Sequence, residues 1–521
     1  MSVSAWTRDR AASASDQIRD RAPSASTCDG VPNCKNYDRR SLIVRDGGPA
    51  NDKKGTIVEA REKFGSRLGF ILISAGCAIG LGNVWRFPSI TGQYGGAAFI
   101  ILYLLFLVAF VLPILVMEFA VGRASQKSIA RSFDALEPTG SRWHFYKWIG
   151  FAGNYILMMF YTTVAGWMLS YVFKSAAGSF RGADADAVGG VFGAMLANPF
   201  EQIFWMIVVV VLGLACTFAG LRKGVERITK VMMGALFVML VALCIRAVTL
   251  DGAGAGLEFY LMPDFSKLFA GGVSGFGQAV YAAMGQAFFT MSVGIGAMTV
   301  FGSYIGKEHG LTGEALRVAG LDTAVAFMAG LIIFPACFAF GVQPDSGPGL
   351  VFVTLPSVFN QMWGGQVWGA LFFVFMSFAA LSTVIAVFEN LMSFTMDQWG
   401  ISRRRAVVIN GIGIAALSLP CALGFNVWSG LEVPGIGNIQ AVEDFIVSNN
   451  ILPLGSLVFL LFCVSKNGWG WENFLAEADA GDGPRFPRWT RTYMRVVLPA
   501  LIIVVLIMGY VPIVSSWLGL A

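Results

Sequence analysis

The chain has 521 residues, of which 56% are hydrophobic and only 13% are charged. Because about a quarter of the residues in a soluble domain are charged, this composition excludes an ordinary soluble protein and predicts an integral membrane protein. Two histidines, His144 and His309, are too few to favour a histidine-based metal site. The cysteines lie mostly within apolar runs, so their pattern indicates no disulfide framework.

Residues 1–60 are polar and rich in Ser, Ala, Asp and Arg. They lack the apolar core of a signal peptide, so we predict a disordered tail. A peptide that docks on the rest of the chain or gates it is the alternative interpretation. We expect residues 61–521 to form a separate domain within the membrane.

Long apolar runs follow this tail, and each is long enough to cross a hydrocarbon layer of about 30 Å as a helix. The fold class that we predict is therefore an all-α polytopic membrane protein. The sequence predicts about eleven spans, at residues 68–90, 96–121, 145–173, 203–220, 228–250, 276–304, 319–342, 366–395, 405–423, 441–464 and 493–516.

Lysine and arginine residues are concentrated in alternate loops. Residues 403–405 are all arginines and belong to the rich set, whereas the opposite loops contain only Lys174, Arg181 and Lys267 between spans. Because cytoplasmic loops carry the excess of positive charge, the N-terminal tail is predicted to be cytoplasmic. An odd number of spans then places the C-terminus outside. We expect a multi-pass protein of the plasma (inner) membrane.

Two spans contain glycine-rich stretches at matching positions. The first span carries Gly76, Gly80 and Gly82, and the sixth contains the stretch FFTMSVGIGAM at residues 288–298. Close helix packing through small residues explains one such stretch. A pair of them five spans apart is typical of an inverted repeat, with the binding site of a secondary transporter at the two breaks. Unwound backbone at this depth must face protein, water or ligand, and its carbonyls suit a hard cation such as Na⁺.

Several motifs identify a resemblance to a known family. They are GLGNVWRFP (80–88), Glu118 with the following Gly-Arg, GQAFFTMSVGIGAM (285–298), AALST (379–383) and EDF (443–445). From about residue 61 to the end, the chain resembles the neurotransmitter:sodium symporters. The resemblance implies the LeuT-type fold, with a 5+5 inverted repeat (spans 1–5 and 6–10), one extra span, and discontinuous spans 1 and 6. Bacterial members of the family often have eleven spans.

The resemblance also implies two sodium sites beside one substrate, with Na⁺ as the coupling ion and no organic cofactor. The first site would comprise Ala78, Asn83, Thr290 and Asp322, completed by the substrate's carboxylate. The second would comprise Gly76, Ile79, Ala379, Ser382 and Thr383. Independently of the family, the last three residues are spaced so that they share one helix face. Hydrogen bonds from the two hydroxyls to preceding helix carbonyls are the structural alternative.

For the substrate, the family implies an amino acid held by its two charged groups. The carboxylate would contact Tyr161, Leu81 and Gly82. The ammonium would contact Ala78, Phe289, Thr290 and Ser292. Monoamine-carrying relatives have an aspartate at the position of Gly80, and glycine leaves room there for a substrate carboxylate.

The side-chain pocket implied by the resemblance contains no charged residue, which favours an apolar or aromatic amino acid. Its lining would comprise Cys77, Leu157, Tyr161, Phe289, Met291, Ile295, Thr383 and Val387. Cys77 replaces an asparagine, and Ile295 a phenylalanine, of the leucine transporter. These departures leave the identity of the amino acid open.

Ionisable residues at the span ends indicate two gates, and ionisable groups in membrane segments are functional candidates. The family implies an outer gate of Arg86 and Asp444, above a lid of Tyr161 and Phe289, and an inner gate of Arg61 and Asp397 with Ser303 and Tyr304. A static salt bridge is the structural alternative for each pair. In the family, the loop at residues 341–359 folds into the outer vestibule.

Two acidic residues lie within spans. Chloride-dependent relatives carry an asparagine at the position of Asp322 and a serine at that of Ala326. A fixed carboxylate could supply the charge that chloride supplies, so we predict chloride-independent transport with Asp322 protonated on the empty return step. For Glu118 we favour a structural acceptor that binds unwound backbone near the first span.

The function that the sequence favours is Na⁺-coupled import of an apolar or aromatic amino acid by alternating access. A proton-coupled permease of the same fold, with Asp322 and Glu118 as its relay, and an amino-acid sensor that does not transport are the alternatives. The enzyme motifs HExxH and GxSxG are absent, so we expect no enzyme. The expected partners are an amino-acid substrate and the lipid bilayer, with no nucleic acid. A monomer suffices for the pathway, and a dimer is compatible with it.

Overall fold

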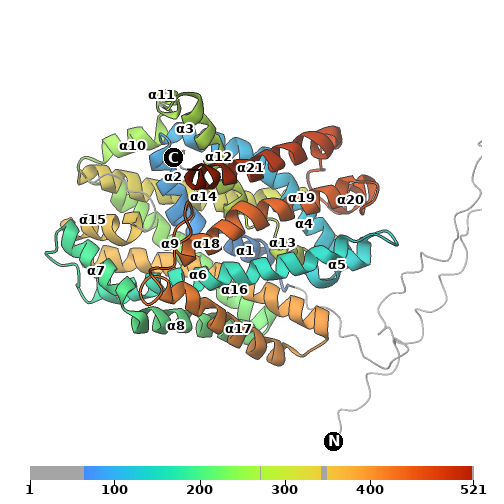
Figure 1. The fold of residues 1–521 in the computed structure, drawn as a ribbon, viewed down its shortest axis with the longest axis horizontal. Coiled ribbons are helices and arrows are strands. Elements are labelled where there is room, and N and C mark those ends of the chain that lie inside the picture. Colours follow the sequence, from blue (N-terminus) through green and yellow to red (C-terminus); the bar gives the residue numbers. More distant parts are fainter. Residues whose placement is uncertain (1–63, 270, 342–348, 519–521) are drawn as a thin grey trace, which may run out of the picture. The chain divides into compact units, whose positions relative to one another are not determined.

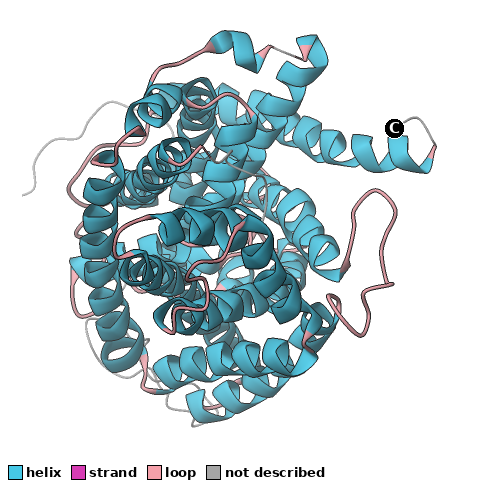
Figure 2. Cartoon of the chain, turned by 90° about the vertical axis from the view of Figure 1, so that its left-hand side faces the viewer, coloured by secondary structure: helices cyan, strands magenta, loops and turns pink. Residues whose placement is uncertain are grey.

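The computed structural model describes residues 64–269, 271–341 and 349–518. The predicted tail and Arg61 therefore lie outside the described residues. Within the described ranges every regular element is a helix, apart from two isolated β-bridges, as Figure 2 shows. The predicted all-α class is thereby confirmed.

Nine helices in the described part of the chain are long and apolar enough to cross a membrane, and one bent pair adds a tenth candidate. The nine are α3 to α4 (Ala97–Ser125), η3 to α6 (Trp143–Ala176), α8 (Pro199–Phe218), η4 to α9 (Leu221–Val248), α14 (Leu311–Ala339), α16 (Gly365–Trp399), α17 (Arg403–Leu423), α18 to α19 (Ile439–Val464) and η7 to α21 (Arg488–Trp517). Shorter helices connect them, namely α5 (Ile129–Leu136), α7 (Ala185–Ala197), α10 (Ala253–Leu261), α11 (Phe265–Leu268), η5 (Leu350–Thr354), α15 (Leu355–Gln361) and α20 (Trp471–Ala478).

The first predicted span is a broken helix. It consists of α1 (Arg67–Ala78), η1 (Gly82–Arg86) and α2 (Phe87–Gln93), and its two halves are bent by 54°. The backbone leaves the helical conformation at Ile79, where ψ is 102°. The break therefore falls in the glycine-rich stretch, as the sequence predicted.

The sixth predicted span is broken in the same way, into α12 (Gly272–Thr290) and α13 (Ala297–Gly302). Between them Ser292, Gly294 and Gly296 have φ values of 49°, 99° and 78°. Glycine adopts this left-handed region without the steric penalty that other residues incur. At Gly294 a Cβ atom would also lie 2.2 Å from the carbonyl oxygen of Leu452, so this close approach itself requires glycine.

Helices α6 and α16 pack along each other through the centre of Figure 1, with α8 and α17 beside them. They run in opposite directions. The rings of Phe151 and Phe394 stack at one end with centroids 4.1 Å apart, and Ser175 lies beside Gly369 at the other. Helix α16 is buried along most of its length and also packs against α1. Side chains of α6, the third predicted span, and of α16, the eighth, therefore lie near the break in the first span.

Candidate functional site

A buried carboxylate lies between the two breaks. The Asn83 side-chain amide donates to Asp322 Oδ1 at 2.8 Å, and the Thr290 hydroxyl donates to Asp322 Oδ2 at 2.9 Å. All three side chains are buried. The Asn83 side-chain oxygen accepts the Gly80 N–H at 3.1 Å, which fixes the start of the helix after the break. The structure thus brings together three of the four residues predicted for the first sodium site, and the fourth, Ala78, ends α1 at the break.

A second cluster of oxygens lies between α1 and α16. Thr383 Oγ1 is 3.3 Å from the carbonyl oxygens of Gly76 and Ile79, and Ser382 Oγ is 3.4 Å from that of Ile79. Ser382 also donates to the Ala379 carbonyl at 2.8 Å, which is the helix-internal bond of the structural alternative. All five residues predicted for the second site therefore meet in one place. Oxygen donors alone are the ligand set that hard cations prefer.

A small cavity of about 20 Å³ lies between the two broken helices. Its space is enough for about one water molecule. The lining residues are Cys77, Ala78, Gly80, Gly82, Leu157, Tyr161, Phe289, Ser292, Ile295, Thr383, Val447 and Leu452. The lining carries no charged side chain, in keeping with the apolar pocket expected from the sequence.

Some predicted pocket residues lie elsewhere. Met291 and Val387 are fully buried but do not line the cavity. Leu81 contributes its backbone N–H, which donates to the Tyr161 hydroxyl at 3.1 Å. Sequence reasoning missed Val447 and Leu452 of the tenth span. Val447 lies three residues after Asp444 of the EDF motif and so on the same helix face, a signal that could have identified it.

Gly80 is required by the geometry of the cavity. A Cβ atom there would lie 2.3 Å from the Tyr161 hydroxyl and 2.6 Å from Thr383 Oγ1. At Gly82 a Cβ atom would lie 2.8 Å from the Phe289 ring. Any larger side chain, including the aspartate of monoamine carriers, would displace these neighbours.

Two aromatic side chains separate this cavity from a larger one. Tyr161 and Phe289 line both the inner cavity and an outer cavity of about 300 Å³. The Arg86 guanidinium lies 4.5 Å from the Phe289 ring centre, a cation–π contact. Arg86 is 4.0 Å from the Asp444 carboxylate, and Ser448 bridges them with hydrogen bonds of 3.3 Å and 2.6 Å. The residues predicted for the outer gate therefore lie together above the lid.

The predicted inner gate is only partly described, because Arg61 lies outside the described residues. The Asp397 carboxylate accepts the Ser128 N–H at 2.7 Å. The Tyr304 hydroxyl donates to Glu389 at 3.0 Å, and Ser303 donates to a carbonyl of its own helix. Ser303 and Tyr304 are both buried.

Polar side chains from other spans hold the two breaks. The Glu118 carboxylate accepts the Gly294 N–H, and the Tyr146 hydroxyl donates to the Gly294 carbonyl. Asn154 donates to the Ile295 carbonyl at 2.9 Å, and Gln286 donates to the Gly82 carbonyl at 2.9 Å. Glu118 is therefore a buried acceptor of unwound backbone, as predicted, but the backbone that it binds belongs to the sixth span and not to the first.

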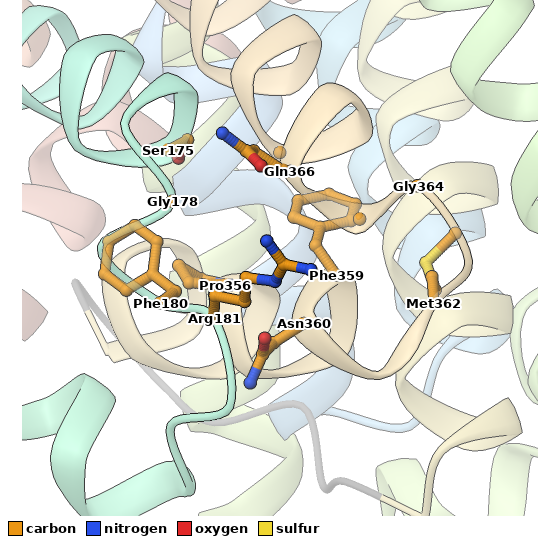
Figure 3. A pocket seen from close by; sticks show the side chains of 12 residues that line it. Ser175, Gly178, Phe180, Arg181, Pro356, Phe359, Asn360, Met362, Gly364 and Gln366 are labelled. Carbon is orange, nitrogen blue, oxygen red and sulfur yellow. The ribbon is translucent and has the colours of Figure 1, made fainter.

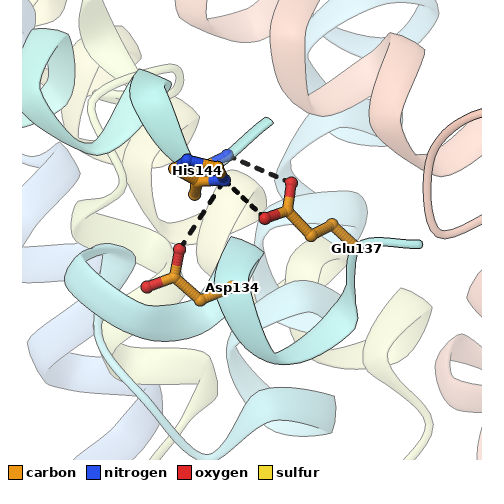
Figure 4. Close-up of side chains that lie close together, drawn as sticks. All are labelled: Asp134, Glu137 and His144. Carbon is orange, nitrogen blue, oxygen red and sulfur yellow. Dashed lines mark hydrogen bonds and ion pairs between the residues drawn. The ribbon is translucent and has the colours of Figure 1, made fainter. Parts of the chain in front are cut away.

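A third polar cluster joins α5 to the start of α6 (Figure 4). His144 Nδ1 lies 2.5 Å from Glu137 Oε1 and 4.0 Å from Asp134 Oδ1, so the three could hold a metal ion by distance alone. Lys147 Nζ is 3.4 Å from the Asp134 carboxylate and supplies a positive charge already. Burial would raise the pKa of Glu137, but hydrogen bonds from Ser141 and His144 outweigh burial and lower it. This cluster is best described as a salt-bridge network.

Comparisons with known proteins agree with this architecture. Residues 61–184 and 196–517 match the sodium:neurotransmitter symporter family. The chain is similar to YhdH, an uncharacterized sodium-dependent transporter of Bacillus subtilis, with 33% identity over 85% of this chain and 96% of that protein. It is 26% identical to the sodium-dependent serotonin transporter of Drosophila melanogaster, over 88% of this chain and 79% of the relative.

Among solved structures, the crystal structure of MhsT in complex with L-phenylalanine is similar, with 38% sequence identity and a TM-score of 0.77. The similarity covers 86% of this chain and all of MhsT. The predicted LeuT-type fold is confirmed by this likeness together with the two broken helices. The chain belongs to the sodium:neurotransmitter symporter family, a family of multi-pass membrane transporters and not of enzymes.

Proposed function

We propose that this protein is a Na⁺-coupled symporter that imports an apolar or aromatic amino acid by alternating access. One observation carries the proposal: two clusters of buried oxygens flank an uncharged cavity at the breaks of two discontinuous helices. The L-phenylalanine bound to MhsT supports an aromatic substrate, given 38% identity between the two chains. Sodium dependence is supported by the similarity of this chain to sodium-dependent transporters.

Different residues of this chain would bind the ions and the substrate. Asn83, Thr290 and Asp322 would hold one Na⁺, and the cluster around Ser382 and Thr383 would hold the other. The N–H of Gly82 at the start of η1 and the Tyr161 hydroxyl would bind the substrate's carboxylate, because helix N-termini attract anions. An ion at the first cluster would then attract that carboxylate, which couples the two bindings.

The fixed charge of Asp322 supports chloride-independent transport. Its carboxylate is fully buried and accepts hydrogen bonds from two neutral donors. A buried carboxylate without a cationic partner is costly, so Na⁺ binding is favoured when it is ionised and protonation is favoured when the ion leaves. The protein thereby returns empty without a chloride ion.

Alternating access follows from the thin lid on the outer side. Tyr161, Phe289 and Arg86 lie between the inner cavity and the outer one, so their displacement opens the site outward. The cytoplasmic N-terminus and external C-terminus predicted from the basic loops complete the proposal. One chain supplies every residue named, so a monomer suffices.

Uptake into proteoliposomes tests this function. The purified protein is reconstituted, and uptake of labelled apolar and aromatic amino acids is measured with Na⁺ or K⁺ outside and with chloride or gluconate as the anion. We expect uptake that requires Na⁺ and is unchanged by gluconate. Uptake driven by a proton gradient in the absence of Na⁺ would favour the proton-coupled permease, and saturable binding without uptake would favour the sensor.

A further inference from the structure

A cavity of about 280 Å³ lies outside the transport pathway, at the end of the α6–α16 pair that is predicted to face outside. It is bordered by the loop after α6, by α15 and by the start of α16. Its walls are about equally polar and apolar, and Phe180, Pro356, Phe359 and Met362 supply the apolar part. Its volume is close to the lower limit of about 300 Å³ for small-molecule pockets.

Two polar groups in this cavity lack a protein partner. The Arg181 side chain, which is exposed to solvent, extends into the cavity toward Phe359 and Asn360, as Figure 3 shows. Among the residues that the structure describes, its guanidinium has no hydrogen-bond or ion-pair partner. Ser175 is only 4% exposed and lines the same cavity, and its hydroxyl has no partner either. The hydroxyl oxygen itself is covered, so it reaches a ligand only when the Ser175 side chain turns toward the cavity. A buried hydroxyl without a hydrogen bond costs about 1–3 kcal/mol, so a ligand toward which it turns gains affinity.

The walls are already fixed in position. Asn360 accepts the Gly182 N–H at 3.1 Å and donates to the Ala183 carbonyl at 2.7 Å, which ties the loop after α6 to α15. Gln366 donates to the Ala176 carbonyl and ties α16 to the end of α6. A ligand would therefore enter a preformed cavity and would not have to order its walls.

From these features we infer that the cavity binds a small organic carboxylate with an apolar body. The planar guanidinium of Arg181 matches a carboxylate in geometry and charge. A phosphate monoester carries nearly two charges, and one arginine would leave part of them unpaired. The Ser175 hydroxyl supplies a second hydrogen bond once its side chain turns toward the ligand, and Phe180 and Phe359 cover the ligand's apolar part.

The site is placed to influence the outer side of the transporter. The helix η5, which leads into α15, carries Phe352, whose ring contacts Trp85 edge-on with centroids 6.4 Å apart. Trp85 in turn lines the outer cavity above the lid. A carboxylate bound to Arg181 would bridge the third span to the segment that contacts the first.

Calorimetric titration with 3-phenylpropionate tests the assignment. The titration uses the full-length protein in detergent and compares wild type, Arg181→Gln and the matched control Arg246→Gln, whose arginine lies at the end of α9 outside this cavity. Loss of a charged hydrogen bond predicts at least about tenfold weaker binding for Arg181→Gln. The control is expected to bind like wild type, and the neutral 3-phenylpropionamide to bind at least about tenfold more weakly than the carboxylate.

Two further variants keep the test decisive. Ser175→Ala is expected to weaken binding several-fold, and it serves if Arg181→Gln does not fold. Gly80→Ala places a methyl group against Tyr161 in the transport cavity, so binding that persists in this variant comes from elsewhere. Three results would each overturn the assignment. They are equal affinity in wild type, Arg181→Gln and Ser175→Ala; loss of binding in Gly80→Ala alone; and no binding to wild type.

Discussion

Replacing Asp322 with asparagine removes a negative charge and leaves the shape of the first ion cluster nearly unchanged. The carboxylate accepts from Asn83 at 2.8 Å and from Thr290 at 2.9 Å, and it is fully buried. An amide can still accept one of these bonds through its oxygen. The change therefore tests the charge more than the packing.

The size of the effect follows from the position of the carboxylate. A cation that uses the oxygens of Asn83 and Thr290 would be a direct neighbour of Asp322. At a separation of about 4 Å and an effective dielectric constant of about 20, two unit charges attract by about 4 kcal/mol. This corresponds to roughly a thousandfold in affinity. Desolvation offsets part of the gain, so we expect the Na⁺ concentration for half-maximal uptake to rise by about 10- to 1,000-fold in gluconate.

The assay is uptake of labelled L-phenylalanine into proteoliposomes over a range of Na⁺ concentrations, in gluconate and in chloride. We expect Asp322→Asn to be inactive in gluconate or to recover in chloride, because a bound chloride can replace the missing charge. Asp251→Asn makes the same chemical change at an exposed site and should behave like wild type. Full activity of Asp322→Asn in gluconate would refute the role of this carboxylate.

Three other predictions concern the second cluster and the stability of the fold. Thr383→Val removes an oxygen that faces first-span carbonyls, and half-maximal uptake should require at least about tenfold more Na⁺. Gly294→Ala, at a φ of 99° and with its Cβ against the Leu452 carbonyl, should lower the free energy of unfolding by at least about 1–3 kcal/mol and so the melting temperature in detergent, whereas Gly285→Ala should not. Arg123→Gln breaks the 2.7 Å buried ion pair with Glu477, and a loss of about 3–5 kcal/mol should appear as a much lower melting temperature. An unchanged value in any of these measurements contradicts the corresponding contact.

The fold could be predicted largely from apolar length and from glycine. Each predicted span coincides with a helix or with a broken pair, because hydrocarbon allows few other structures. The positions of both breaks could be predicted from the two glycine-rich stretches. The structure shows why glycine is needed there, because Gly80 and Gly294 leave no room for another side chain. The sixth span was harder to delimit, because α13 has only 6 residues and α12, although 19 residues long, is not among the helices that are both long and apolar enough to cross a membrane.

Local sequence patterns predict the residues that supply the ion-binding oxygens, but not all the residues that line the cavity. Ser382 and Thr383 lie three and four residues after Ala379 and so share its helix face, but this spacing fits an ion site and hydrogen bonds to helix carbonyls equally well. Val447 and Leu452 face the cavity only because the tenth span packs against the break in the sixth. That packing depends on how helices distant in sequence cross. The spacing from Asp444 indicates Val447, but the sequence contains no direct signal for Leu452. The residue pair Arg61 and Asp397 stays a prediction.

The breaks themselves explain why distant polar residues are needed. Unwinding a helix at membrane depth frees N–H and carbonyl groups, and an unsatisfied group in hydrocarbon costs several kcal/mol. Carbonyls that face the ion clusters can be satisfied by Na⁺, but N–H groups cannot. At Gly294 the Glu118 carboxylate takes the N–H, while Tyr146 satisfies the carbonyl that points away from the ions. A buried polar residue in a span opposite a predicted break is thus a candidate for holding that break, and this rule would have assigned Glu118, Tyr146 and Asn154 together.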